Sequence, residues 1–173
     1  NTDKVQKKSD KSKVIVGPAE SMSKSKKNTI DPEKMIAEYG ADSVRFFILS
    51  DSPPEKDIQW SDSGMNSSYK YIQKFWLLNE KICLVLKDKK ANSNEDIDLF
   101  VNQAIKKINF ALEKFRYNVI IAIFHEIYSF FTKILETNLN YSNLKENYKK
   151  ILITMLPVIP HIANECLEKI NEK

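Results

Sequence analysis

The spacing of apolar residues over the last two-thirds of the chain limits its fold more than any other feature. From residue 63 onward, large apolar side chains recur every three or four positions, in runs separated by short polar stretches. This period matches one face of an α-helix rather than the alternation of a β-strand. Three glycines and six prolines in 173 residues also provide few of the turns that an all-β fold needs. We therefore expect a mostly α-helical protein.

The apolar runs predict a helical bundle. The expected helices cover residues 63–86, 101–115, 118–134, 144–156 and 161–170. In the second of these, apolar residues from Val101 to Phe115 follow nearly a seven-residue repeat, which is typical of the seam of an antiparallel bundle. Asn118 is the predicted N-cap of the third helix.

Two shorter helices are predicted before the bundle. Asp31 suits the N-cap of the first, and Pro32 suits its first position, where the missing N–H costs nothing. Gly40 is expected to end this helix in a left-handed conformation. The predicted inner face consists of Met35, Ile36 and Tyr39.

The second short helix follows at once. Asp42 is its predicted cap, and Arg45 is expected to face outward. The inward positions are Val44, Phe47 and Ile48. The sequence Ser52-Pro53-Pro54 then breaks the helical pattern, because consecutive prolines remove backbone donors.

Positive charge is concentrated at the front of the chain. The formal net charge is +4, but residues 1–30 hold eight lysines against three acids. Residues 1–12 have no apolar period and are predicted to be a flexible linker, whereas residues 13–16 have the β-branched composition of a short strand. Composition leaves two interpretations of the basic front open, a solvated segment or a contact with a polyanion.

No self-contained catalytic or metal-binding motif is apparent. Cys83 and Cys166 lack a second Cys or His at ligand spacing, so we expect no zinc and two buried thiols in a reducing compartment. His125 has no relay partner at a suitable spacing, and the string beginning at His161 lacks the glycine of a nucleotide-binding His-Ile-Gly-His motif. The longest apolar run, residues 119–124, is far shorter than the roughly 20 residues that span a bilayer. No membrane role is expected.

The best candidate for chemistry is the loop Ser21-Met22-Ser23-Lys24-Ser25-Lys26-Lys27-Asn28. Its ammonium groups alternate with hydroxyls, and both can bind phosphate oxygens together with loop amides. The alternative is an ordinary solvated loop. Its place between a predicted strand and a capped helix favours the phosphate site.

Several motifs together resemble the class I aminoacyl-tRNA synthetases. Residues 22–28, the sequence Ile30-Asp31-Pro32 and residues 39–47 are similar to the KMSKS region and the helices that follow it. Within the class, residues 52–57 and 60–64 most resemble the leucyl-tRNA synthetases. Residues 116–118, 121–122 and 157–161 resemble their helical tRNA-binding domain.

This resemblance implies a domain plan and an activity. Residues 13–62 would be the end of a Rossmann-type catalytic domain, with the KMSKS loop and stem-contact helices, and residues 63–173 an anticodon-binding-like helical bundle. The parent would be a cytoplasmic, monomeric leucine–tRNA ligase that uses ATP with Mg²⁺, leucine and tRNA(Leu). Because the chain begins at Asn1 and no His-Ile-Gly-His element precedes the loop, we expect a piece of a longer enzyme that is inactive alone.

The resemblance also implies roles for single residues in the loop. Lys24 matches the second lysine of the motif, which stabilises the transition state as the adenylate forms and pyrophosphate leaves. The implied ATP-binding residues are Met22, Ser23, Lys24, Ser25 and Lys26. Ser21 stands where the motif usually has its first lysine, and Lys26 or Lys27 are the candidate substitutes. No metal ligand is implied in this chain.

The bundle carries the candidate tRNA contacts. They are Lys70, Lys74, Lys106, Lys107, Lys114 and Arg116. For each, an ordinary solvated helix face is the alternative, and Phe75 and Trp76 are expected in the core. Two other functions stay open at this point: an isoleucyl, valyl or methionyl synthetase, or a helical RNA-binding module without chemistry.

Overall fold

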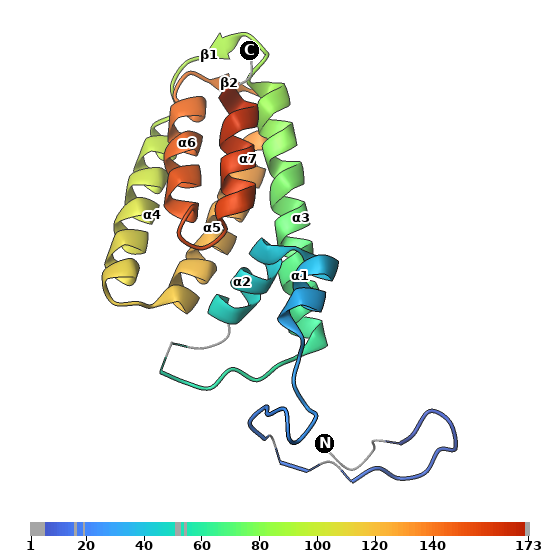
Figure 1. The fold of residues 1–173 in the computed structure, drawn as a ribbon. Helices are drawn as coiled ribbons and strands as arrows, with labels where there is room; N and C mark the ends of the chain where they lie inside the picture. The colour runs from blue at the N-terminus through green and yellow to red at the C-terminus, as the bar shows by residue number, and fades with distance from the viewer. Residues whose placement is uncertain (1–5, 16, 19, 51–52, 54, 172–173) are drawn as a thin grey trace. The chain divides into compact units, whose positions relative to one another are not determined.

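The computed structural model describes residues 6–15, 17–18, 20–50, 53 and 55–171. The chain forms two compact units, Asn1–Asp31 and Pro32–Lys173. The second unit is almost entirely helical, which confirms the mostly α fold class (Figure 1). In the first unit, the predicted strand at residues 13–16 is not formed by its described residues. Lys13 instead makes an isolated antiparallel bridge with Gln6, and Val16 lies outside the described residues.

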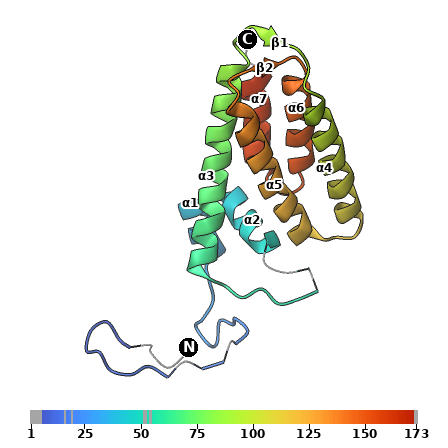
Figure 2. The same cartoon turned by 180° about the vertical axis from the view of Figure 1, so that it is seen from behind.

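Helices α3 to α7 form the bundle. They are α3 (Asp62–Val85), α4 (Glu95–Glu113), α5 (Tyr117–Leu135), α6 (Leu144–Met155) and α7 (Pro160–Asn171). The five bundle helices predicted from the apolar period are confirmed, although α4 begins earlier than expected. Asn94 caps α4, because its side chain accepts a hydrogen bond from the Asp96 N–H at 3.0 Å. In both views of the bundle, α3 and α4 lie at opposite edges (Figures 1 and 2).

Helix α5 is long and apolar enough to cross a membrane by length and composition. In the structure it packs against α2, α3 and α4. Its buried residues are Ile120, Ile121, Ile123, Phe124, Ile127, Phe131 and Ile134. These contacts make α5 a core helix of the bundle.

The junction between α4 and α5 differs from the prediction. Helix α4 ends at Glu113, so Phe115 leaves the apolar seam, and its side chain is 64% exposed. Asn118 is not a cap, because α5 already begins at Tyr117 and Arg116 occupies the cap position without a side-chain hydrogen bond. The seven-residue repeat continued past the end of the helix and therefore gave the wrong position for Phe115.

A small sheet, which the sequence analysis did not predict, joins the two loops at the other end of the bundle. Strand β1 (Lys90–Ala91) pairs in parallel with β2 (Asn140–Tyr141). The buried Asn140 amide donates to the carbonyls of Leu86 and Asp88, at 3.2 and 2.7 Å. The loops that follow α3 and α5 are thereby fixed to each other.

The two short helices form as predicted, but some of the side chains expected to face inward are exposed. Helix α1 (Pro32–Tyr39) is followed by Gly40 at φ +80°, as expected, and α2 spans Ala41–Ser50. Met35 and Tyr39 pack on a small cluster of Val44, Phe47 and Met65. The inward positions predicted for Ile36 and Ile48 are wrong, since these side chains are 46% and 44% exposed.

The polar residues of α2 bind the distant turn between α6 and α7. Asp42 is not the cap of its own helix: its buried carboxylate accepts from the Ile162 N–H at 2.7 Å and hydrogen-bonds His161 Nδ1 at 2.8 Å. It therefore caps α7. Arg45 is exposed, as predicted, and its Nε and Nη2 donate to the carbonyls of Val158 and Pro157, at 2.9 and 2.8 Å.

The start of α3 explains the glycine in the sequence Trp60-Ser61-Asp62-Ser63-Gly64. Ser61 is the N-cap, and its Oγ accepts from the Gly64 N–H at 3.0 Å. A Cβ atom on Gly64 would lie 2.7 Å from a ring carbon of Phe47 and 2.7 Å from the Ser61 Oγ. The Phe47 ring is buried and packs edge-on against Trp60, with centroids 5.1 Å apart. A side chain at position 64 would therefore separate α2 from α3.

We predict that Gly64→Ala destabilises the chain although alanine favours helix. The helix preference is worth about 1 kcal/mol, and overpacking against Phe47 costs about 1–3 kcal/mol together with the displaced cap. The free energy of unfolding in urea is therefore expected to fall. Ser63→Ala, an exposed change in the same turn, is the matched control and is expected to leave stability nearly unchanged. A Gly64→Ala chain as stable as the wild type would contradict this packing.

Candidate functional site

The loop at residues 20–28 is held in shape by one asparagine. The Asn28 Oδ1 accepts from the Ser23 N–H at 2.8 Å, and its Nδ2 donates to the Ser21 carbonyl at 3.4 Å. Between these points the chain makes a turn, closed by the Lys27 N–H on the Lys24 carbonyl at 3.2 Å. Lys27 adopts φ +53° to complete this turn. The motif alone did not reveal this role of Asn28.

The serines and Lys26 are occupied inside the loop. The Ser23 Oγ accepts from the Lys26 N–H at 3.3 Å and lies 3.2 Å from the Ser25 Oγ. The Lys26 ammonium pairs with Glu20 at 2.9 Å, with both side chains about half exposed. Such a surface pair contributes about 1 kcal/mol or less, so an arriving anion can replace Glu20. Lys26 is thus available to a phosphate only by exchange of partners.

Lys24 differs from Lys26. It is exposed at the start of the turn, and no group in the described part of the chain forms an ion pair or hydrogen bond with its ammonium. Met22, two residues earlier, is 46% exposed. The structure therefore brings the five predicted loop residues together. Among them, Lys24 carries the accessible ammonium, whereas the ammonium of Lys26 is paired with Glu20.

The six cations proposed for tRNA separate into two groups. Lys70 and Lys74 lie one turn apart on α3, and the other four follow α4 and the turn after it. All six are exposed. In the two views α3 and α4 lie at opposite edges of the bundle, so the two groups are carried by separate helices (Figures 1 and 2). In the second group, Lys107 pairs with Glu126 of α5 at 3.5 Å.

The two aromatic residues expected in the core behave differently. Phe75 is fully buried, as predicted. Trp76 is half-buried, and the ammonium of Lys169 lies 4.8 Å from its ring centroid. Neither ring is presented to solvent in the manner of a base-stacking residue.

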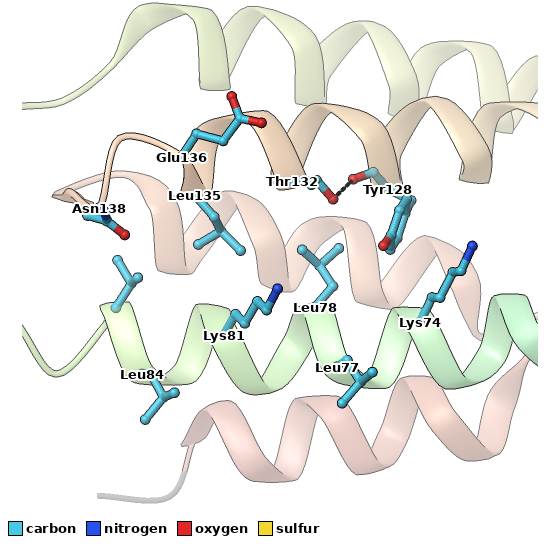
Figure 3. A pocket seen from close by; sticks show the side chains of 11 residues that line it. Lys74, Leu77, Leu78, Lys81, Leu84, Tyr128, Thr132, Leu135, Glu136 and Asn138 are labelled. Atoms are coloured by element: carbon cyan, nitrogen blue, oxygen red, sulfur yellow. Dashed lines mark hydrogen bonds between the residues drawn. The ribbon is translucent and has the colours of Figure 1, made fainter.

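A groove of about 560 Å³ runs between α3 and α5 (Figure 3). Its lining is mainly aliphatic, with Leu77 exposed by 59%. Lys74 and Lys81 carry its positive charges, and Glu136 is its one carboxylate. The Thr132 hydroxyl is engaged by the Tyr128 carbonyl at 2.7 Å. This chemistry is unlike a phosphate or catalytic site.

No group of three or more His, Cys, Asp or Glu side chains among the described residues is arranged to hold a metal ion. Cys166 is buried, which raises the pKa of its thiol to about 12, and Cys83 is half-buried without a disulfide. The prediction of a buried thiol is therefore confirmed for Cys166, whereas Cys83 is only partly buried.

Both histidines contact other side chains of the fold. His161 is held by Asp42. The His125 ring packs edge-on against Tyr71 and Phe46, with centroid distances of 4.6 and 5.9 Å. Partial burial, and then the charge of Lys74, lower the pKa of His125 below its ordinary value. The folded chain therefore favours the neutral imidazole.

We predict a pH dependence of stability that depends on His125. The unfolded chain takes up a proton near pH 6.5, whereas the folded chain does so only at lower pH. The stability that neutral His125 contributes is complete above about pH 6.5, and it is lost as the pH falls through the lowered pKa of the folded chain. In urea unfolding at pH 7.5 and about pH 5.5, His125→Gln is expected to lose less stability than the wild type. Equal losses would show that His125 does not titrate differently on folding.

Comparisons with known proteins agree with this geometry. The family described as class I tRNA synthetases (I, L, M and V) matches residues 13–61, and the anticodon-binding domain of tRNA ligases matches residues 94–173. The chain therefore belongs to the class I tRNA synthetases. Its curated relatives within that class are leucine–tRNA ligases, and the resemblance to the leucyl enzymes is confirmed.

Over the aligned residues, the relatives are about one-third identical to this chain. The leucine–tRNA ligase of Rickettsia bellii is 38% identical over 161 residues, which are 92% of this chain and 19% of that protein. The enzyme of Roseobacter denitrificans is 35% identical over 156 residues, 90% of this chain and 18% of its own length. The chain thus spans about a fifth of the length of these bacterial proteins.

A solved structure has the same fold. It is the Agrobacterium radiobacter K84 agnB2 LeuRS in a ternary complex with tRNA and LeuAMS, with a TM-score of 0.77 and 23% identity. The match covers 88% of this chain and 21% of that one. At this identity the likeness supports the helical architecture.

Proposed function

We propose that this chain is a segment of a cytoplasmic leucine–tRNA ligase, which joins leucine to tRNA(Leu) at the expense of ATP. The loop at residues 20–28 would contact ATP, and the bundle would bind tRNA. The proposed boundaries are residues 13–62 for the end of the catalytic domain and 63–173 for the bundle. The observation that carries the proposal is the accessible ammonium of Lys24, in a loop whose neighbouring hydroxyls and Lys26 already have partners.

The residues of the loop fit a phosphate group. Lys24 and Lys27 are exposed cations on flexible stems, and the turn leaves hydroxyls and amides beside them. Magnesium would arrive with ATP, since the described residues offer no cluster of ligands for it. Met22, Ser23, Ser25 and Lys26 would line the ATP site beside Lys24, with Lys26 exchanging Glu20 for a phosphate oxygen.

The chemistry proposed for Lys24 is charge stabilisation. An oxygen of the leucine carboxylate attacks the α-phosphorus of ATP, the bond from that phosphorus to the bridging oxygen breaks, and pyrophosphate leaves with the electron pair. Negative charge develops on the departing oxygens, and the Lys24 ammonium would neutralise it. A preorganised contact of this kind contributes most where charge appears only in the transition state. Ser23 and Asn28 act by fixing the loop.

The bundle would meet the backbone of tRNA through its exposed cations. Lys106, Lys107, Lys114 and Arg116 form the larger group, along α4 and its last turn, and Lys70 and Lys74 form a second contact on α3. Each phosphate contact of this type adds roughly 0.7–0.9 to the dependence of log affinity on log salt concentration. The charge of Lys107 is partly offset by Glu126, so its contribution would be the smallest of the four.

We predict that Lys24→Ala, in the full-length ligase that contains this chain, slows leucine-dependent ATP–pyrophosphate exchange by about 10²- to 10³-fold. The fold should be unaffected, because this side chain is exposed and contributes to no core. Lys34→Ala, which removes an exposed lysine of α1, is the matched control and should exchange at the wild-type rate. An unchanged rate in Lys24→Ala would exclude the catalytic role of the loop.

The same assay decides the amino acid. Leucine, isoleucine, valine and methionine are compared as substrates for exchange and for charging of tRNA(Leu). Leucine alone is expected to support both reactions efficiently. Preference for another of the four would assign the chain to a different class I synthetase, and no exchange with any of them would favour an RNA-binding module.

A further inference from the structure

The turn after α4 places a large aromatic residue in a conformation that suits glycine. The Phe115 N–H donates to the Leu112 carbonyl at 3.0 Å, and the Arg116 N–H donates to the Ala111 carbonyl at 2.8 Å. These bonds define a Schellman motif, in which the residue after the C-cap is left-handed and is usually glycine. Phe115 occupies this position at φ +53°. A residue with a Cβ is strained there.

Packing does not compensate for this strain. The Phe115 side chain is 64% exposed, and the one ring contact it makes within the described chain is an edge-on contact with Tyr117 at 6.4 Å. Stability of the bundle alone would favour glycine at this position. The phenyl ring is therefore displayed on the surface at a cost to the fold.

The surroundings of Phe115 are strongly basic. Lys114 and Arg116 flank it in the sequence, and both are exposed. Phe110, one turn earlier on α4, is 57% exposed and lies at helical spacing from Lys106, Lys107 and Lys114. The acids nearby are the exposed Glu113 beside Lys114 and the Glu126 that pairs with Lys107. Exposed aromatic rings thus alternate with positive charges along one edge of the bundle.

We propose that Phe115, assisted by Phe110, stacks on unpaired nucleotides of the bound tRNA, while Lys114 and Arg116 bind the adjoining phosphates. Aromatic side chains stack on bases whatever the sequence, and flanking cations hold the backbone, which is the usual chemistry of unpaired RNA sites. The excess of positive charge favours a polyanion over a protein surface. This inference rests on the proposed tRNA-ligase function and specifies which part of the bundle holds unpaired RNA.

The test uses opposite effects on folding and binding. Phe115→Gly relieves the left-handed strain, so the urea midpoint of the 173-residue chain is expected to rise or stay level. Binding of tRNA(Leu) by the full-length ligase, followed by fluorescence anisotropy, is expected to weaken about tenfold, because stacking of one base is lost. Phe115→Trp should retain binding. Leu99→Ala, which truncates a side chain that is 59% exposed elsewhere on α4, should change neither quantity.

Salt dependence separates stacking from charge. Phe115→Gly should leave the slope of log affinity against log salt unchanged, since stacking releases no counterions, whereas Lys114→Ala with Arg116→Ala should reduce it by roughly 0.7–0.9 per cation. If the wild-type ligase binds and charges tRNA(Leu) but Phe115→Gly binds equally well, the stacking proposal is overturned and the ligase function stands. If the variant binds normally and the full-length ligase melts at a lower temperature, another part of the enzyme covers Phe115 and the stacking proposal is likewise overturned. A wild-type ligase that fails to bind or charge tRNA(Leu) overturns the proposed function itself.

Discussion

The hydrogen bonds from α2 to the α6–α7 turn are the constraint on which the helical unit depends. The turn contains Pro157 and Pro160, so its backbone lacks donors and leaves carbonyls without helical partners. Arg45 supplies two charged donors to the carbonyls of residues 157 and 158, and Asp42 supplies an acceptor to the Ile162 N–H in the first turn of α7. A carboxylate at a helix N-terminus also meets the positive end of the helix dipole. Two side chains one turn apart therefore satisfy both sides of the turn.

This arrangement gives a physical reason for two motifs that lie far apart in the sequence. Residues 39–47 and 157–161 carry the family resemblance, and the structure shows them to be two halves of one contact. The neighbouring Phe46 stacks on Tyr71 at 4.5 Å, and the Tyr71 hydroxyl donates to the Phe124 carbonyl at 3.0 Å. Helix α2 is thereby joined to α3, α5 and α7, so it belongs to the core of the bundle rather than to the loop segment before it.

The helices could be predicted from the sequence because apolar spacing is a local property. The period located α3, α5, α6 and α7 well, and caps such as Pro32 and Gly40 located α1. It failed where a distant partner decides the outcome. In the sequence, Asp42 and Arg45 resemble ordinary helix-surface residues, and their partners more than 100 residues later cannot be read from spacing. The predicted seam position of Phe115 was wrong for another reason, because an apolar repeat does not show where the helix ends.

The loop was predictable for a related reason. The residues from Met22 to Lys26 are adjacent in sequence, so one motif identified all of them. Their hydrogen-bond and ion-pair partners, however, could be found only in the structure. Asn28 fixes the turn and Glu20 pairs with Lys26, so that Lys24 carries the accessible ammonium among these five residues. The six candidate cations of the bundle show the opposite case, because composition grouped them and the fold divides them between two edges.

Asp42 holds α2 and α7 together, and amide hydrogen exchange in Asp42→Ala tests this contact most directly. Loss of a buried charged acceptor leaves the Ile162 N–H unpaired, which costs about 1–3 kcal/mol. We predict that the amides of α2 and of the first turn of α7 lose protection against exchange together. The amides of α4 that exchange by partial unfolding should keep their wild-type protection. Protection of α2 equal to that of the wild type, with or without a change in α7, would contradict this account.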